Sequence, residues 1–339
     1  MNPPVRKTPS IAIDIHAHMM HPDVYAVTVA HSAFGKSVVD PTLSPEAKAK
    51  AKERSAFVVA KMSDAKGRIA DMDKMGVDMQ LVMPPPPQCY HTVALEYAVP
   101  AARMVNDGVA EFVSKHPDRF IPTGTVPMQN GPEAAKELER CMKVLNFKGV
   151  EILTNVAGRE LSDPAFAPFW AKAEELGALV IIHPNGFTEG KRLSRFYFNN
   201  IIGNPFETTL ALHYLIFDGV LERHPKLKIY VMHGGGYLGA YPGRIDHGWG
   251  ARSDCQASLP KPPTSYLKQI YFDTVVFTPL QLETLVRTFG VDHVIMGTDY
   301  PFDMLEFDPI GHINSVESFD ASTRAALAGG NLQKLLGLK

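Results

Sequence analysis

Short runs of consecutive apolar residues alternate along the chain with longer segments in which apolar residues recur every three or four positions. A short continuous apolar run is typical of a strand buried on both faces, and the longer spacing is typical of an amphipathic helix. The pattern predicts strands over residues 11–15, 78–83, 121–126, 149–153, 178–182, 227–232, 269–272 and 293–296. It predicts helices over residues 65–75, 97–115, 132–145, 164–176, 205–223, 279–289 and 322–336.

The repeated order of strand and helix predicts the fold class. Eight buried strands, each followed by a helix or a long connection, are typical of an α/β protein that folds as a (β/α)8 TIM barrel. The main alternative is an open, doubly wound parallel sheet. Neither an internal repeat nor a domain linker interrupts the pattern, so we expect residues 1–339 to form one barrel domain.

One segment does not fit the alternation. Residues 20–64 are long, polar in parts and without a regular period. We interpret residues 20–64 as an insertion after the first strand that covers the mouth of the active site, because loops at the carboxyl ends of barrel strands surround that mouth.

Composition and charge narrow the class of protein. A chain of 339 residues that is 45% hydrophobic is long enough to bury a large core. The net charge of −2, without a basic stripe, argues against nucleic-acid binding, and no apolar run is long enough for a membrane span. The N-terminal residues lack the apolar core of a signal peptide, and the widely spaced Cys89, Cys141 and Cys255 are typical of reduced thiols. We therefore expect a cytoplasmic protein.

The first strand ends in a pair of histidines. His16 and His18 are two residues apart, so in a strand both imidazoles point to the same side. At the carboxyl end of a barrel strand that side faces the active site, and two converging imidazoles favour a divalent metal. A His-x-His pair also occurs by chance, so this pair alone does not establish a metal site.

Three further strands end in residues that bind metals or transfer protons. The fifth apolar run ends at His183, the sixth at His233 followed by three glycines, and the eighth at Asp299. Packed core histidines would lie at any position along their strands. Polar residues repeated at the same end of several strands are instead what a barrel active site requires, so the sequence predicts a metal site there.

These residues, with the motifs around them, resemble the amidohydrolase superfamily and, within it, the aminocarboxymuconate-semialdehyde decarboxylase family. The resemblance extends from residue 13 to residue 336. That group also includes benzoate-type decarboxylases, carbon–carbon bond hydrolases and hydratases. The narrower resemblance rests on the motifs His233-Gly234-Gly235-Gly236, Gly243-Arg244-Ile245-Asp246, Tyr271-Phe272-Asp273-Thr274 and Gly297-Thr298-Asp299-Tyr300-Pro301-Phe302.

The resemblance implies one divalent metal ion, Zn²⁺ or alternatively Mn²⁺, with water completing its shell. Many amidohydrolases hold two metals bridged by a carboxylated lysine on the fourth strand. Here Lys148 lies at the wrong end of that strand, so one metal fits better, and Glu151 is interpreted as a polar group near the site or a structural residue. The ligands that the resemblance implies are His16, His18, His183 and Asp299.

The resemblance also implies catalytic roles. His233 acts as the general base toward metal-bound water, a task for which the ordinary pKa of histidine is suited. Asp299 binds the metal and also moves a proton to carbon. Arg244 matches an arginine that binds a substrate carboxylate, in some members across a dimer interface. A salt bridge on the helix surface, to Asp246 or a neighbouring residue, is the equal alternative for Arg244.

Other substrate contacts are less defined. The second arginine of the family has two candidates here, Arg54 and Arg68. Phe187, in the loop after the fifth strand, is a candidate for an aromatic wall against a planar substrate, with simple loop packing as the alternative.

Three functions remain open at this stage. The first is non-oxidative decarboxylation of a carboxylated muconate semialdehyde or hydroxyaryl acid. The second is hydrolysis or hydration of an aromatic ring-cleavage product on the same metal site. The third is a metal-binding barrel without catalysis, which an intact base at His233 disfavours. The expected partner is a small carboxylate substrate, and the resemblance implies a homodimer or higher homo-oligomer.

Overall fold

The computed structural model describes residues 10–21, 23–24, 44–256 and 259–338, and all eight predicted strands form in it. The third predicted strand is divided into β3 and β4. The barrel strands are β1 (Ile13–His18), β2 (Met79–Met83), β3 (Phe120–Pro122), β4 (Gly124–Thr125), β5 (Gly149–Leu153), β8 (Leu179–His183), β9 (Lys228–Val231), β10 (Ile270–Asp273) and β11 (Val294–Ile295). A small antiparallel pair, β6 (Asn155–Val156) and β7 (Arg159–Glu160), lies in a loop after β5.

The barrel strands run parallel and are arranged in chain order around one axis. They form two sheets, β1-β2-β3 and β11-β10-β9-β8-β5-β4, and only Thr123 separates β3 from β4. At the other junction, backbone hydrogen bonds join β1 to the segment after β11, from Ile15 N to Met296 O (2.9 Å) and from His18 N to Tyr300 O (2.7 Å). Because the first strand bonds both to the second strand and to the segment that follows the last strand, the barrel prediction is confirmed over the open-sheet alternative.

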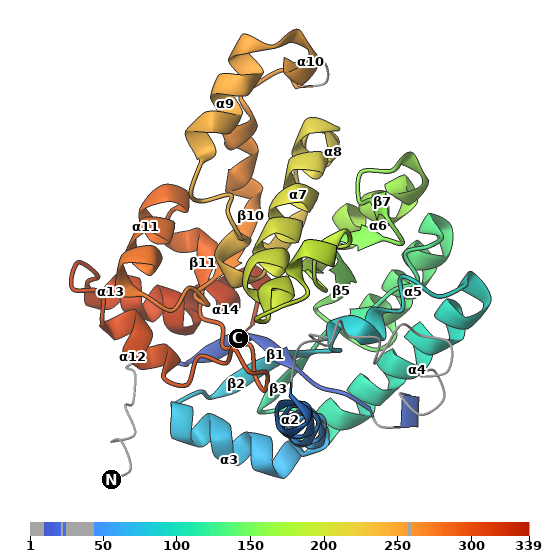
Figure 1. Cartoon of the computed structure of the whole chain (residues 1–339), viewed down its shortest axis with the longest axis vertical. Coiled ribbons are helices and arrows are strands. Elements are labelled where there is room, and N and C mark those ends of the chain that lie inside the picture. The colour runs from blue at the N-terminus through green and yellow to red at the C-terminus, as the bar shows by residue number, and fades with distance from the viewer. Residues whose placement is uncertain (1–9, 22, 25–43, 257–258, 339) are drawn as a thin grey trace.

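Helices surround the strands, as Figure 1 shows. The helices predicted over 205–223 and 322–336 are each divided, the first at Gly219, which adopts a φ of 72°. The helices are α2 (Pro45–Ser63), α3 (Ala65–Met75), α4 (Leu95–Ser114), α5 (Gly131–Lys143), α6 (Ala167–Leu176), α7 (Asn204–Phe217), α8 (Val220–Arg223), α9 (Pro242–Ala251), α10 (Ser253–Gln256), α11 (Pro279–Phe289), α12 (Pro309–Asn314), α13 (Ala321–Ala325) and α14 (Asn331–Leu336).

Single helical turns complete the connections. Two of them, η4 and η8, are π-helical turns that run directly into α7 and α14. The turns are η1 (Pro86–Cys89), η2 (Pro164–Phe166), η3 (Gly190–Leu193), η4 (Asn199–Gly203), η5 (His233–Gly235), η6 (Pro263–Gln269), η7 (Val291–His293) and η8 (Ala326–Gly330).

The irregular character predicted for residues 20–64 is wrong for their second half, where α2 forms. The Ser44 hydroxyl accepts a hydrogen bond from Ala47 N (3.2 Å), and Pro45 occupies the first turn, where its missing N–H costs nothing. The sequence of α2 shows no helical period of apolar residues, because this helix buries only Met62 and therefore needs no apolar stripe. Residues 25–43 lie outside the described residues, and the position of the whole insertion over the mouth stays a prediction.

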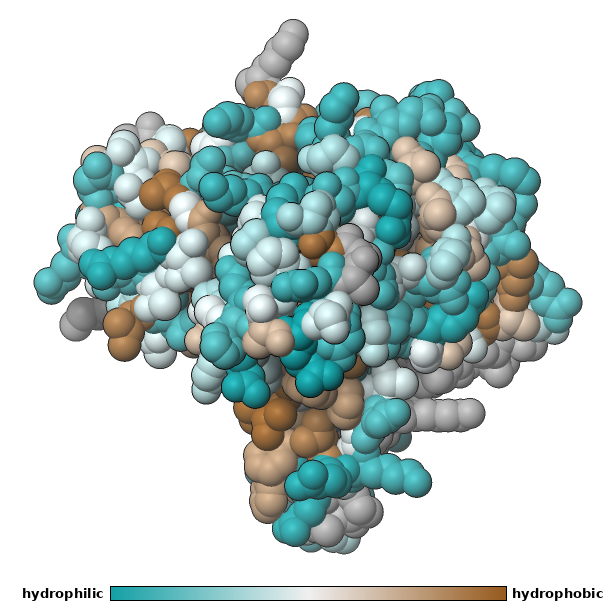
Figure 2. Space-filling view, turned by 90° about the horizontal axis from the view of Figure 1, so that it is seen from above, coloured by the Kyte–Doolittle hydropathy of each residue, from teal (hydrophilic) through white to brown (hydrophobic). Residues whose placement is uncertain are grey.

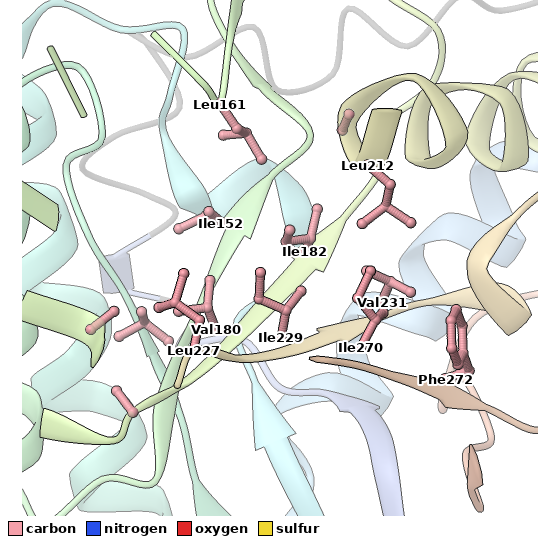
Figure 3. Close-up of a cluster of buried hydrophobic side chains, with 14 of the residues drawn as sticks. Ile152, Leu161, Val180, Ile182, Leu212, Leu227, Ile229, Val231, Ile270 and Phe272 are labelled. Carbon is pink, nitrogen blue, oxygen red and sulfur yellow. The ribbon is translucent and has the colours of Figure 1, made fainter. Parts of the chain in front are cut away.

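The core has two layers, one inside the ring of strands and one between strands and helices. Figure 3 shows the outer layer, in which Leu212 of α7 lies over Ile182 of β8 and Val231 of β9. The inner layer is filled by alternate residues of the same strands: Ile13, Ile15, Leu81, Met83, Ile121, Leu179, Ile181, Tyr230, Met232 and Ile295. Strands buried on both faces explain why the sequence shows continuous apolar runs rather than alternation.

The surface is mainly polar. In Figure 2 hydrophilic residues cover most of the face, and apolar side chains gather on a projection at its lower edge. Among the described residues, no helix combines the length and the apolar character that crossing a membrane requires. Cys89, Cys141 and Cys255 are all unpaired, as expected from their spacing.

We predict that Leu212→Ala lowers the free energy of unfolding by about 2–5 kcal/mol, because it leaves a cavity in a fully buried layer. Denaturant titration followed by circular dichroism measures this change. The matched control is Leu280→Ala on α11, where the side chain is 74% exposed and the expected change is within about 0.5 kcal/mol. Equal losses for the two variants would contradict the assignment of Leu212 to the core.

Candidate metal centre

The carboxyl ends of three strands bring four metal-binding side chains together. His16 and His18 come from β1, His183 ends β8, and Asp299 follows β11. One ligand atom of each lies within 4.8 Å of the others, and all four residues are buried. The structure thus collects the four predicted ligands at one point, although the first and last are separated by most of the chain.

Each ligand histidine is fixed through its Nδ1 atom. His16 Nδ1 lies 2.9 Å from Asp273 Oδ2, His18 Nδ1 lies 3.3 Å from the carbonyl of Pro84, and His183 Nδ1 lies 2.6 Å from the carbonyl of Pro184. These oxygens can only accept, so each Nδ1 carries the proton that it donates. In the neutral form every Nε2 then presents a lone pair toward the centre of the cluster.

The four inward atoms form no hydrogen bond with any described residue, although Nε2 of His16 and of His18 lie 3.3 and 3.5 Å from Asp299 Oδ1. They are Nε2 of His16, His18 and His183, and Oδ1 of Asp299, and all are buried. A buried polar atom without a partner costs about 1–3 kcal/mol, so four at one point call for a ligand. A divalent cation satisfies all four at once, and three imidazoles with one carboxylate suit Zn²⁺ or Mn²⁺.

The electrostatics of the cluster keep three of the four ligands in their metal-binding forms. At His16 the effect of burial is outweighed by the charges of Asp299 and Asp273, which raise the pKa of its imidazole. Burial lowers the pKa of His18 to about 4 and lowers the pKa of His183 well below its ordinary value. Burial opposes ionisation of Asp299, but the neighbouring imidazoles of His16 and His18 hold the pKa of its carboxyl below the usual range. At neutral pH the cluster therefore offers lone pairs and a negative charge to a cation.

Asp273, at the end of β10, orients the ligand His16 and the turn that carries His233. Its carboxylate accepts hydrogen bonds from the Tyr230 hydroxyl (2.9 Å), His233 N (3.1 Å) and Gly234 N (2.8 Å), besides its contact with His16 Nδ1. Sequence reasoning quoted Asp273 only as part of a motif and gave it no role. The sequence feature that could have indicated this role is the position of Asp273 at the end of the seventh predicted strand.

A second buried carboxylate ties the first strand to the last. Asp14 accepts hydrogen bonds from His16 N (2.8 Å), from the Thr298 backbone and hydroxyl (3.0 and 2.6 Å), and from the Gln80 amide (2.9 Å). Burial raises the pKa of Asp14 to about 6. Asp14 therefore fixes the backbone of β1 against the segment that presents Asp299.

His233 faces the cluster without belonging to it. Its Nε2 atom lies 3.8 Å from Asp299 Oδ2, and its ring centre lies 5.3 Å from that of His16 and 5.4 Å from that of His183. The backbone of His233 has a φ of 54°, an uncommon conformation that two hydrogen bonds to Asp273 hold in place at His233 and Gly234. The imidazole is thus placed to exchange a proton beside the ligands.

The glycines after His233 are required by the turn. Gly236 has a φ of 66°, and a Cβ atom there would lie 2.2 Å from the carbonyl oxygen of Pro205. A residue with a side chain would have to move the start of α7, so the chain can pass from β9 into this turn only with glycine at that position.

Phe302, Asp303, Arg54 and Tyr197 lie near the ligands, and the sequence gave little signal for these contacts. The Phe302 ring lies 4.9 Å from the ring of His18. Next to it, Asp303 Oδ1 lies 2.5 Å from Arg54 Nε of α2. Tyr197, in the loop after β8, is close enough for the charges of Asp303 and Asp299 to act on it.

Among the described residues, no contact joins the two predicted substrate contacts, Arg244 and Phe187, to the four ligands. Arg244 is exposed on α9, and no contact among the described residues joins its side chain to the ligands. The alternative salt bridge to Asp246 is not formed either, because Asp246 accepts hydrogen bonds from Thr264. Phe187 packs against Phe206, with ring centres 5.0 Å apart. Figure 1 shows α9 at the upper end of the molecule, beyond the barrel.

Two further candidates prove to be buried. The guanidinium of Arg68 donates to Gln80 Oε1 (3.2 Å) and to the carbonyl of His18, which makes Arg68 a support of the backbone rather than a substrate contact. Glu151 is buried with Cys89 Sγ 3.7 Å from its Oε1, and burial raises the pKa of its carboxyl well above the ordinary value.

We predict that Asp273→Asn weakens Zn²⁺ and Mn²⁺ binding by about 10- to 100-fold, because His16 loses the carboxylate that sets its tautomer. Competition with a chromophoric chelator measures both affinities. Asp246→Asn on α9 is the matched control and should bind metal as the wild type does. Unchanged metal affinity in Asp273→Asn would show that the carboxylate does not organise the site.

Comparison with known proteins agrees with this geometry. Residues 13–338 match the amidohydrolase family. The chain is 37% identical over 272 residues to a 2-amino-3-carboxymuconate-6-semialdehyde decarboxylase of Dictyostelium discoideum, covering 80% of this chain and 76% of the relative. It is 27% identical over 281 residues to a gamma-resorcylate decarboxylase of Rhodococcus jostii, covering 76% and 80%.

A solved structure has the same fold over almost its whole length. The 5-carboxyvanillate decarboxylase LigW of Sphingomonas paucimobilis superposes with a TM-score of 0.84 at 25% identity, covering 97% of this chain and 99% of that one. The relatives named here are decarboxylases, and the family match spans the barrel from its first strand to its last helix. The chain therefore belongs to the amidohydrolase family.

Proposed function

We propose that this protein is a metal-dependent, non-oxidative decarboxylase of a carboxylated muconate semialdehyde or hydroxyaryl acid. The observation that supports this most directly is the set of four buried, unpartnered donor atoms with His233 beside Asp299. The relatives at 37% and 27% identity are named as decarboxylases of such acids, which makes decarboxylation the preferred chemistry for this site.

The four ligands would hold one divalent ion, which would lower the pKa of a bound water molecule toward neutrality and polarise a substrate oxygen. His233 would accept a proton of that water as general base, and the hydroxide left behind would regain a proton from solvent at the end of the turnover. The bond between carbon and carboxylate then breaks, CO₂ leaves, and one proton replaces it at carbon. The carboxyl of Asp299 and the imidazole of His233, 3.8 Å apart, move this proton.

Substrate carboxylates are recognised by arginines at the mouth. Arg54 is the better of the two candidates for the second arginine, because it reaches Asp303 beside Phe302, whereas Arg68 is buried. Arg244 is exposed on α9, and no contact among the described residues joins its side chain to the metal ligands of its own chain. Our proposal is that Arg244 binds substrate in the site of a second copy in a homodimer. A guanidinium binds a carboxylate through two parallel hydrogen bonds, which orient the acid.

We predict that the Zn²⁺- or Mn²⁺-loaded protein releases CO₂ from at least one member of a panel of carboxymuconate semialdehydes, hydroxybenzoates and carboxyvanillate-like acids. Removal of the metal with a chelator abolishes release, and either ion restores it. Cleavage or hydration of a ring-cleavage product by the metallated protein, without CO₂, would transfer the function to the hydrolase or hydratase alternative.

We predict that His233→Asn lowers kcat by about 10²- to 10⁴-fold and leaves the bound metal unchanged, because the base is lost while all four ligands remain. Steady-state kinetics and metal analysis of the same preparation test both parts. His224→Asn, whose imidazole pairs with Glu174 on the outer surface, is the control. Wild-type turnover in His233→Asn would exclude its role as base.

A further inference from the structure

An ion pair between α2 and the segment that follows Asp299 joins two distant parts of the chain. Arg54 Nε of α2 lies 2.5 Å from Asp303 Oδ1, four residues beyond the ligand Asp299. Both side chains are accessible, with 62% and 36% exposed. Neither has another charged partner within ion-pair distance among the described residues, so each is the other's main electrostatic contact.

The pair lies next to the ligands. Phe302, adjacent to Asp303, packs its ring 4.9 Å from the ring of His18. Burial and the charges of Asp303 and Asp299 raise the pKa of Tyr197 to about 12, while Arg54 acts in the opposite direction. The phenol, the carboxylate and the guanidinium of three separate segments therefore lie near one another and near the ligand Asp299.

Most hydrogen-bond donors of the Arg54 guanidinium form no hydrogen bond with a described residue. Asp303 engages Arg54 through one oxygen and the Nε atom, and no other hydrogen bond from this guanidinium to a described residue is formed. A ligand carboxylate competes for the same donors and can accept two parallel hydrogen bonds. Asp303 and a second substrate carboxylate would therefore compete for the same guanidinium.

We propose that Asp303 determines specificity between acids with one and with two carboxylates, by pairing with Arg54 until a second carboxylate displaces it. The inference rests on the proposed decarboxylase function. In that reaction one carboxylate is at the metal centre. A monocarboxylate has no further anion for Arg54 and leaves the pair intact, whereas a dicarboxylate must break it.

The expected size of the change in binding affinity follows from the exposure of the Arg54–Asp303 ion pair. An exposed ion pair changes an equilibrium constant by up to about fivefold, and a charged hydrogen bond to a ligand changes it by about 10-fold or more. Asp303→Asn should therefore tighten isophthalate up to about fivefold relative to benzoate. Arg54→Gln should weaken isophthalate about 10-fold or more relative to benzoate.

Calorimetric titration of the Zn²⁺-loaded protein with isophthalate and benzoate, which differ by one carboxylate, tests the inference without turnover. The decisive variant is the double substitution Arg54→Gln with Asp303→Asn. If Asp303 acts through Arg54, Asp303→Asn changes the ratio of the two affinities in the wild-type background and not in Arg54→Gln. Asp254→Asn, which breaks the exposed Arg252–Asp254 pair of α10, is the control for loss of an acidic charge.

Two results would overturn the inference. An unchanged affinity ratio in Asp303→Asn would show that the pair does not select substrates, and a weaker binding of isophthalate would show that Asp303 positions Arg54 instead of competing for it. Either can occur while CO₂ release continues, which separates this failure from that of the proposed function. Absence of both acid binding and CO₂ release in the wild type would reject the two together.

Discussion

The carboxylate of Asp273 is the contact on which the rest of the site depends. It holds His16 through Nδ1, and it accepts the backbone N–H groups of His233 and Gly234. One buried side chain on β10 thereby sets the lone pair of a metal ligand and the turn that presents the base. Burial of such a charge is costly in isolation, and the hydrogen bonds around it offset that cost and keep the pKa of Asp273 below its usual range.

The same arrangement explains why the barrel and its metal ligands could be predicted from the sequence. Strands buried on both faces must be continuous apolar runs, and a break in such a run at His183 or Asp299 marks the carboxyl end of a strand. Parallel strands bring those ends to one edge, so the position of a polar residue along its strand already places it in space. The two-residue spacing of His16 and His18 adds their common direction.

What the sequence could not predict depends on contacts between distant segments. In the sequence, Asp273 does not differ from other polar residues at the end of a strand. Its role becomes evident only from the hydrogen bonds that Tyr230 and His16 donate to it. The partnership of Arg54 with Asp303 joins positions 249 residues apart, and α2 lacks an apolar stripe because it is mostly exposed. Arg244 was predicted from a motif alone, and a motif does not show where in space its side chain lies.

The most direct test of the account is anomalous diffraction, recorded at the metal absorption edge, from crystals of the Zn²⁺- or Mn²⁺-loaded protein. The account predicts a single strong peak at about 2.0–2.2 Å from Nε2 of His16, His18 and His183 and from a carboxylate oxygen of Asp299. His233 should lie outside the coordination shell. A peak at another place, a second ion beside the first, or coordination through His233 would contradict the central claim that these four buried donors form one mononuclear site.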